Sequence, residues 1–292
     1  QELQLLRHGQ PFPDLRSTEQ HDLRSELIQG SSENPLESGS EGDAATSSQR
    51  PLDAAYRLAG FIKAGDAPNE DLLLLAQVDA SVGGKNGVNF KDYKNMVGVF
   101  NQPEFVICDL NMLSTLPREE LCCGFAEIIK HGVIADKSMF DYIEKHYCQA
   151  LALDLSVIEK LVYDSVVIKS RIVNQDAREK GVRRHLNFGH TFGHAIEKTL
   201  QIRHGEAVSA GMVLASELSV KRGTLPDPQA TRLYRLLEKY GLPVQLPYDE
   251  NEVLTAIKMD KKRDGDHIKF VLLSEIGRAF VDDVLIQELV DL

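Results

Sequence analysis

Three histidines lie close together in the second half of the sequence: His190 and His194 in the segment HTFGH, and His204 in HGE ten residues further on. If HTFGH is helical, His190 and His194 share one face of the helix. His204 follows across a predicted turn at 203–205. Three neutral imidazoles, or two with a carboxylate, form an open zinc site with one position left for substrate. A lone pair at this spacing is more often a surface feature, but the third histidine favours a metal site.

A carboxylate and an ammonium group share one face of the apolar segment AEIIK, at Glu127 and Lys130. Such a pair is costly to bury unless each charge has a partner. A metal ion would compensate Glu127, and an anionic ligand would compensate Lys130. The competing interpretation is an ordinary surface ion pair at i,i+3, which this motif taken alone favours.

Further cationic and amide groups could bind an anion. The run Gly83-Gly84-Lys85 would let the backbone approach a phosphate, although it lacks the spacing of a P-loop. An arginine offers a planar fork suited to a carboxylate, and a lysine offers a point charge. Solvated turns and helix faces are the competing interpretation. The remaining candidates of this kind are Lys169, Asp176, Arg183, Asn187 and the run Asp260-Lys261-Lys262.

These groups fall on a small α/β part followed by a mostly helical part. The apolar run 72–78 is typical of a buried strand or a short helix, and the pattern at 105–110 predicts a strand. A Gly-rich loop is expected between them. Helical patterns cover 119–134, 137–146, 155–175, 190–200, 206–222 and 227–240, and two short strands are predicted at 269–273 and 278–281. Residues 30–51 are rich in Ser, Gly and acidic residues, so residues 1–50 are predicted to be an atypical, disordered segment.

Composition limits the class of protein. The chain has 292 residues, 42% of them hydrophobic, and a formal net charge of −11, which argues against binding to nucleic acid or to an anionic membrane. It contains no long uncharged apolar run and no basic start followed by an apolar stretch, so neither a transmembrane helix nor a signal peptide is predicted. Four cysteines without CxxC spacing, Cys108, Cys122, Cys123 and Cys148, are predicted to be reduced core thiols of a cytoplasmic protein.

Taken together, these segments resemble the 3-dehydroquinate synthase family of sugar-phosphate cyclases. The resemblance covers about residues 72–292 and is carried by LLAQVDASVGGKNGVN, KNMVGVFNQP, TLPREELCCGFAEIIKHG, REKGVRRHLNFGHTFGHAIE, HGEAVSAGM and DKKRDGDHIKFVLLSEIG. It implies a remnant of an α/β NAD-binding domain at 51–116 and a helical metal- and substrate-binding domain at 117–292. It also implies a phosphate-eliminating lyase of the shikimate pathway, with NAD and divalent zinc or cobalt as cofactors. The substrate would be 3-deoxy-D-arabino-heptulosonate 7-phosphate and the products 3-dehydroquinate and phosphate.

The resemblance also implies roles for individual residues. The metal ligands would be Glu127, His190 and His204, whereas the spacing alone would have made His194 a ligand. Catalytic and substrate-contacting positions are Asp79, Lys85, Lys130, Lys169, Arg183, Asn187, His194 and Lys261. Cofactor-binding positions are Asp79, Lys94, Asn95, Thr115, Leu116 and Glu120, of which Asn95 also matches a substrate-contacting position. The family suggests a homodimer.

The front of the chain departs from the family. Residues 51–71, PLDAAYRLAGFIKAGDAPNED, lack the family's glycine triplet, which cradles the dinucleotide pyrophosphate. The chain is also shorter than the family leads one to expect, so we expect a truncated, rearranged or frame-shifted front end. Two hypotheses follow: an active synthase, or a non-catalytic relic that keeps the metal site but cannot hold NAD. Sibling cyclases such as 2-deoxy-scyllo-inosose synthase, and a metal-dependent glycerol dehydrogenase relative, are further alternatives. His194 favours the dehydroquinate branch over the epi-valiolone branch.

Overall fold

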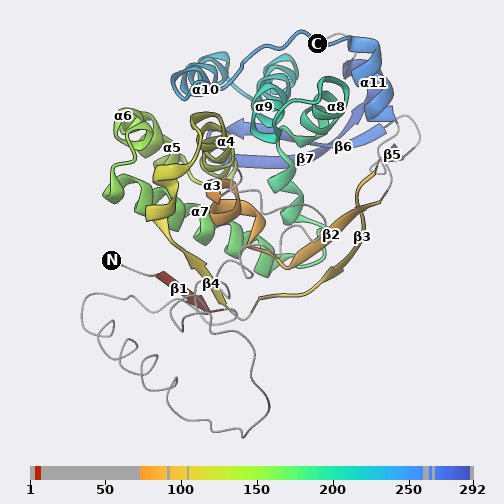
Figure 1. Ribbon diagram of the computed structural model, residues 1–292. Helices are drawn as coiled ribbons and strands as arrows, with labels where there is room; N and C mark the ends of the chain where they lie inside the picture. The colour runs from red at the N-terminus through yellow and green to blue at the C-terminus, as the bar shows by residue number, and fades with distance from the viewer. Residues whose placement is uncertain are drawn as a thin grey trace, which may run out of the picture.

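Helices dominate the fold (Figure 1). In a computed structural model of the protein, the structure describes residues 4–7, 73–90, 93–103, 105–258, 263–264 and 267–289, with only the backbone described for 4–7, 88–90, 93–97, 250, 258 and 263–264. The α-helices in these ranges are α3 (Leu73–Leu75), α4 (Arg118–Ala135), α5 (Lys137–Lys145), α6 (Tyr147–Leu151), α7 (Leu155–Gln175), α8 (His190–Leu200), α9 (His204–Lys221), α10 (Asp227–Lys239) and α11 (Glu250–Lys258). Shorter helical turns are η3 (Ala76–Ala80), η4 (Leu110–Thr115), η5 (Val182–Asn187) and η6 (Ile286–Leu289).

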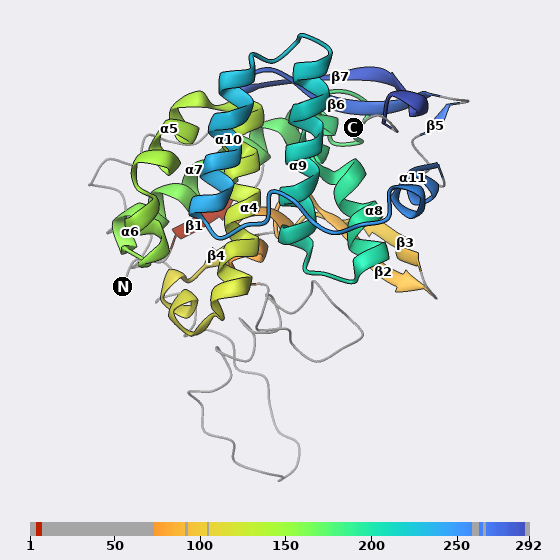
Figure 2. The ribbon, with the colours of Figure 1, turned by 90° about the horizontal axis from the view of Figure 1, so that it is seen from above.

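Helix α4 lies at the centre of the core. Every residue from Leu121 to Ile134 is buried, including the charged side chains of Glu127 and Lys130. The helix contacts α7 and α9, and Figure 2 shows it side by side with α9 and α10. Because α4 is enclosed on all sides, its apolar residues stabilise the fold, while its charged residues must find partners inside the protein.

The helices α8 and α9 approach each other closely at glycines. Gly189, which precedes α8, has a left-handed backbone (φ 76°), and a Cβ there would lie 2.9 Å from the carbonyl oxygen of Val208. A Cβ on Gly211 of α9 would lie 2.0 Å from the carbonyl oxygen of Gly189. Only a residue without a side chain fits such a contact. This packing fixes the start of α8 against the body of α9.

Capping residues in the sequence fix where the neighbouring helices begin. The Asp136 carboxylate accepts the backbone N–H groups of Ser138 and Met139, which opens α5. Asp154 opens α7 in the same way. At the start of α9, the Glu206 side chain accepts the backbone N–H of Arg203 at 3.2 Å. Each cap satisfies backbone donors that have no partner within the helix.

The strands form three small antiparallel sheets in the described ranges. Strand β2 (Lys85–Phe90) pairs with β3 (Tyr93–Phe100), and β1 (Gln4–Arg7) pairs with β4 (Phe105–Cys108). The third sheet has the order β5-β6-β7, with β5 at Arg263–Asp264, β6 at His267–Glu275 and β7 at Arg278–Leu285. Phe270 and Leu272 of β6 are buried, and β6 contacts α9.

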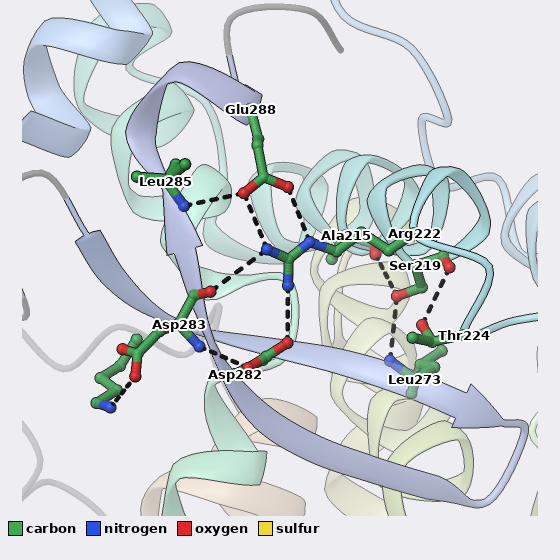
Figure 3. Close-up of polar contacts among 10 residues, drawn as sticks. Ala215, Ser219, Arg222, Thr224, Leu273, Asp282, Asp283, Leu285 and Glu288 are labelled. Carbon is green, nitrogen blue, oxygen red and sulfur yellow. Dashed lines mark hydrogen bonds and ion pairs between the residues drawn. The ribbon is translucent and has the colours of Figure 1, made fainter.

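The end of α9 is fastened to the C-terminal sheet through polar contacts (Figure 3). The Arg222 guanidinium donates to both carboxylate oxygens of Glu288 at 2.9 Å and to Asp282 at 2.7 Å. One turn earlier, the Ser219 hydroxyl accepts the backbone N–H of Leu273 at 3.1 Å. A bidentate arginine–carboxylate pair adds directional strength, so these contacts hold β6, β7 and η6 against the helix that carries His204.

The structure confirms most of the helices expected from the sequence and corrects other expectations. Residues 85–100, expected to lie in a loop, form the β2–β3 hairpin; of the two alternatives for 72–78, a buried strand or a short helix, the structure shows the helical one over 73–80. Cys148 is exposed, so it is not a core thiol, unlike Cys108, Cys122 and Cys123. Residues 4–7 form β1, although they lie in the segment predicted to be disordered, and the rest of 1–50 lies outside the described residues. No helix in the described part of the chain could cross a membrane.

The contact between α8 and α9 leads to a stability prediction. Gly211→Ala places a methyl group 2.0 Å from the Gly189 carbonyl oxygen and 2.8 Å from the Gly193 nitrogen, both of which are backbone atoms. We expect the free energy of unfolding to fall by about 1–3 kcal/mol, because backbone cannot move aside cheaply. Urea denaturation measures the loss. Ser216→Ala on the same helix adds no atom and should cost no more than about 1 kcal/mol. Equal stabilities of the two variants would contradict the close packing.

Candidate metal and substrate site

Three helices bring one carboxylate and two imidazoles together. The carboxylate is that of Glu127 on α4, and the imidazoles are those of His190 at the start of α8 and His204 at the start of α9. Glu127 Oε1 lies 3.6 Å from His190 Nε2 and 3.5 Å from His204 Nε2. The three candidate ligand atoms all lie within 4.8 Å of one another. This spacing allows all three to bind a single divalent cation.

The other ring nitrogen of each histidine has its own partner. His190 Nδ1 lies 3.1 Å from the carbonyl oxygen of Phe188, which can only accept, so Nδ1 carries the proton. His204 Nδ1 lies 3.3 Å from Glu197 Oε2 on α8. Both contacts leave Nε2 directed toward Glu127, where it can offer a lone pair to a metal once it carries no proton. A carboxylate or carbonyl behind a histidine is the usual support of a metal ligand.

The Glu127 carboxylate fits a metal ligand because it is fully buried. Neither of its oxygens accepts a hydrogen bond from the described residues, although Oε2 forms an ion pair with Lys130 one turn along α4. Burial raises the pKa of Glu127, but the Lys130 ammonium together with His204 and His190 outweighs it, so the pKa is lowered. The group is therefore an ionised carboxylate in a dry environment, which a cation would stabilise.

A second buried ion pair lies beside the first. Lys169 on α7 contacts the Asp79 carboxylate at 2.7 Å and also donates to the Asp79 carbonyl oxygen. Burial raises the pKa of Asp79, yet Lys169 and Lys130 together hold it well below its usual range. Burial lowers the pKa of Lys169 itself, although Asp79 opposes this shift. His131, fully buried, lies with Nε2 3.7 Å from Asp79 Oδ1.

The charges of these four groups cancel. Asp79 and Glu127 contribute two negative charges, and Lys130 and Lys169 contribute two positive charges. A divalent ion bound at Glu127 would add two positive charges to these four groups. The Glu197 carboxylate behind His204 offsets one of them, and the remaining excess is stable in a buried place only with an anionic ligand. The geometry thus suits a metal together with an anion better than either alone.

Glu127, His190 and His204 form the candidate metal-binding trio, and its two histidines differ in protonation. Burial and the nearby Lys130 ammonium hold the pKa of His190 well below its usual value. Burial also acts to lower the pKa of His204, but the carboxylates of Glu127 and Glu197 raise it to about 9. With no cation bound, His204 thus supplies the positive charge that the two carboxylates attract.

Other predicted substrate contacts surround this centre. Arg183, on η5 and buried, donates to the carbonyl oxygens of Ala177 at 2.8 Å and Gly83 at 3.0 Å. It therefore ties the Gly83–Gly84 turn to the segment before α8. Lys85 at the start of β2 and Asn187 at the end of η5 both contact the Glu179 carboxylate.

His194 lies on the exposed side of the trio. Its ring centroid is 5.2 Å from that of His190 and 6.2 Å from that of His204, and the residue is exposed. It forms a second group of candidate ligands with Glu197 and His204, but Glu197 already supports His204 through Nδ1. The buried trio with Glu127 is therefore the stronger candidate for a resident ion, and His194 is placed beside it.

Apart from Asp79, the predicted cofactor contacts lie elsewhere or are only partly described. Thr115 donates to the Met112 carbonyl oxygen, Leu116 follows at the end of η4, and Glu120 accepts from Arg203 at 2.9 Å. Lys94 and Asn95 lie on β3, where only the backbone is described. Lys261 lies outside the described residues.

Sequence reasoning missed three residues of the site: His131, Glu179 and Glu197. His131 directly follows Lys130 in the quoted EIIKH segment, and its placement one turn after Glu127 was a usable signal. Glu197 lies seven residues after His190, on the same helical face, which could also have been read from the sequence. Glu179 gave no such signal, because only the fold brings it to Lys85.

The fold and site define a mostly helical protein that can hold a divalent cation beside a buried cluster of two carboxylates and two lysines. Comparison with known families gives a narrower class. The model of the 3-dehydroquinate synthase N-terminal domain matches residues 68–123, and that of the C-terminal domain matches residues 124–263. The chain belongs to the 3-dehydroquinate synthase family.

Curated relatives agree with this assignment. The 3-dehydroquinate synthase of Campylobacter concisus is 44% identical over 212 residues, 71% of this chain and 60% of the relative. That of Nitrosospira multiformis is 45% identical over 212 residues, 71% of this chain and 58% of the relative. The chain thus spans about 60% of the length of the curated relatives that it matches.

Solved structures of related cyclases share the fold. ValA, a 2-epi-5-epi-valiolone synthase from Streptomyces hygroscopicus subsp. jinggangensis solved with NAD⁺ and Zn²⁺, is 28% identical with a TM-score of 0.69, covering 75% of this chain and 62% of that one. A 2-deoxy-scyllo-inosose synthase, solved with carbaglucose-6-phosphate, NAD⁺ and Co²⁺, is 27% identical with a TM-score of 0.69, covering 75% and 64%.

The contact between Glu197 and His204 leads to a prediction on metal affinity. Glu197→Gln removes the negative charge behind His204 Nδ1 while keeping the shape of the side chain. We expect the Zn²⁺ affinity to fall about 10- to 100-fold, because supporting carboxylates orient a histidine ligand and raise its basicity. Competition with a chromophoric chelator measures it. Glu252→Gln, which removes an exposed charge on α11, should leave the affinity unchanged. Equal affinities in both variants would argue against this role.

Proposed function

We propose that this chain carries the metal- and substrate-binding part of a 3-dehydroquinate synthase. The reaction would convert 3-deoxy-D-arabino-heptulosonate 7-phosphate into 3-dehydroquinate and phosphate. The observation that carries the proposal is the trio of Glu127, His190 and His204 directly beside a buried cluster whose charges cancel before a metal binds. An anionic substrate is the ligand that this arrangement favours once a divalent ion is held.

The donor set fits zinc or cobalt. Two imidazole nitrogens and one carboxylate oxygen are borderline ligands that suit either ion, and three protein ligands leave a position open. Held there, the ion would act as a Lewis acid on a substrate hydroxyl. Glu127, His190 and His204 would hold it, while Phe188 and Glu197 fix the orientation of the two rings.

The remaining groups would bind and orient the substrate. Asp79, whose lowered pKa keeps it ionised, can accept a hydrogen bond or a proton from a hydroxyl group, with Lys169 and His131 limiting its movement. Lys130 adds a buried positive charge next to the reacting carbons. Lys85, Arg183 and Asn187 supply donors for the carboxylate and phosphate. Fixing one flexible substrate through several steps is an orientation task, which suits many rigid contacts.

The reaction would use NAD⁺ to take a hydride from the substrate and return it later. An α/β nucleotide-binding part would hold this cofactor, with Asp79, Lys94, Asn95, Thr115, Leu116 and Glu120 as its contacts on this side. NAD⁺ appears with a metal in the solved relatives ValA and 2-deoxy-scyllo-inosose synthase, which supports the same cofactor pair here.

A second candidate function is a non-catalytic relative that holds metal but not NAD⁺. It is favoured by the sequence of residues 51–71, which lacks a glycine triplet, and these residues lie outside the described ranges. Calorimetric titration of NAD⁺ into the zinc-loaded protein separates the two candidates. Saturable binding is expected for the synthase. A flat titration with zinc still bound would favour the non-catalytic candidate.

The proposed reaction leads to a prediction on Lys169. With Zn²⁺ and NAD⁺ present, we expect the protein to release phosphate from the heptulosonate substrate, and Lys169→Met to lower kcat/KM at least about 100-fold. A buried charge aimed at the reacting groups is worth that much. Zn²⁺ binding should survive, because Lys169 contacts Asp79 and not the trio.

Lys160→Met on the same helix is the matched control for Lys169→Met. Lys160 is exposed and pairs with Asp164 at 2.7 Å, so its loss should leave kcat/KM unchanged. A Lys169→Met variant as active as the control would contradict the proposed site. Absence of phosphate release from the wild-type protein under these conditions would contradict the proposed function itself.

A further inference from the structure

His131, on α4, has no hydrogen-bond partner for either of its ring nitrogens. The residue is fully buried, and neither Nδ1 nor Nε2 is hydrogen bonded within the part of the chain that the structure describes. A buried polar group left without a partner costs about 1–3 kcal/mol. An apolar side chain of similar size would avoid this cost, so packing of the core alone does not explain the imidazole.

One ring nitrogen of His131 lies close to the Asp79 carboxylate on η3. The distance from Nε2 to Asp79 Oδ1 is 3.7 Å, slightly longer than a hydrogen bond. Lys169 contacts the same oxygen at 2.7 Å. Both groups thus approach Oδ1, while a carboxylate has a second oxygen that can accept from another donor. The Asp79 side chain is 26% exposed, so a ligand can reach it.

A metal ion does not fit as the missing partner of His131. His131, Asp79 and Glu127 do offer ligand atoms within 4.8 Å of one another. However, Lys130 already pairs with Glu127, and Lys169 already pairs with Asp79. The two ammonium groups would repel a cation held between the same carboxylates. The partner that remains for His131 is the Asp79 carboxylate itself.

A neutral imidazole can donate one hydrogen bond to Asp79. Burial lowers the pKa of His131, and this effect exceeds the opposing effect of the Asp79 carboxylate. The neutral ring carries a single N–H, which at Nε2 faces an oxygen that can only accept. A small movement would complete this bond, and the hydrogen bonds of catalytic groups are often long until substrate binds.

We propose that His131 is a positioning residue, and that its Nε2–H donates to Asp79 Oδ1 once substrate is bound. This inference rests on the proposed function, in which Asp79 accepts from a substrate hydroxyl group. With Oδ1 held by both Lys169 and His131, the carboxylate resists rotation and Oδ2 stays directed at that hydroxyl. His131 acts through Asp79 and does not touch the substrate. Its loss should therefore slow the chemical step more than it weakens substrate binding.

His131→Leu and His131→Gln test the inference. Leucine removes both ring nitrogens at similar volume, whereas the glutamine amide can donate from nearly the same place as Nε2. With Zn²⁺ and NAD⁺ present, we expect His131→Leu to lower kcat for phosphate release about 10- to 100-fold and to change KM less than about threefold. His131→Gln should recover most of the loss. In urea denaturation without substrate, His131→Leu should be at least as stable as the wild type, because no hydrogen bond is lost.

His146→Leu is the matched control. His146 also has a buried ring nitrogen without a hydrogen-bond partner in the described residues, but it lies between α5 and α6, which carry no residue of the site. Its replacement should leave kcat and KM unchanged. The Zn²⁺ affinity, measured by competition with a chelator, should be unchanged in all three variants.

The outcomes separate the role of His131 from the proposed function. If the wild type releases phosphate and His131→Leu keeps its kcat, the positioning role is overturned while the proposed function stands. A His131→Leu variant that loses stability or Zn²⁺ affinity together with kcat would also overturn the role, because a place in the core or at the metal would then explain the loss. Equal losses of kcat in His131→Leu and His131→Gln would do the same. If the wild type releases no phosphate, the proposed function fails and the inference fails with it.

Discussion

The site depends on one carboxylate that is enclosed where water does not reach. Glu127 is fully buried, and its negative charge is tolerated because Lys130 lies on one side and two imidazoles lie on the other. An isolated charge in this position would be expensive, so the surrounding cations are a requirement of folding as much as of binding. The same requirement explains why the apolar helix α4 carries a glutamate and a lysine in its middle.

The close backbone contact between α8 and α9 fixes the positions of the two histidines relative to each other. The two histidines stand at the first positions of α8 and α9, and the glycine contact between these helices sets the separation of their rings. Carbonyl and carboxylate partners at Nδ1 then fix the direction of each ring. The site is thus built from helix starts, with the Phe188 carbonyl just before α8 supporting His190 and Glu197 of α8 supporting His204 of α9.

Local patterns in the sequence predicted most of the helical domain, because each helix carries its own signals. The pattern at 155–175 predicted α7 with both of its ends correct, and the structure shows Asp154 as its N-cap. The β2–β3 hairpin was missed because Gly83, Gly84 and Gly87 suggested a loop, and the pairing that makes it a hairpin is a contact between strands. The short helix α6 was also missed, since Ala150 is its one buried residue, and α11 was missed although Val253, Leu254 and Ile257 are buried at helical spacing.

The spacing of His190 and His194 could not decide between them as ligands. Both lie on one helical face, and only the position of Glu127, 63 residues earlier, distinguishes the buried ring from the exposed one. The resemblance to the family supplied that choice, and the structure brings the same three side chains together. The contact of Glu179 with Lys85 depends wholly on tertiary folding, so no local pattern pointed to it.

All three candidate ligands come from helices that share one hydrophobic core. Any ion captured there is therefore linked thermodynamically to the folded state of that core. At a free ion concentration 100 times the dissociation constant, such a ligand adds about 2.7 kcal/mol to the free energy of unfolding. Metal supply would then govern how long the protein persists, and not only whether it reacts.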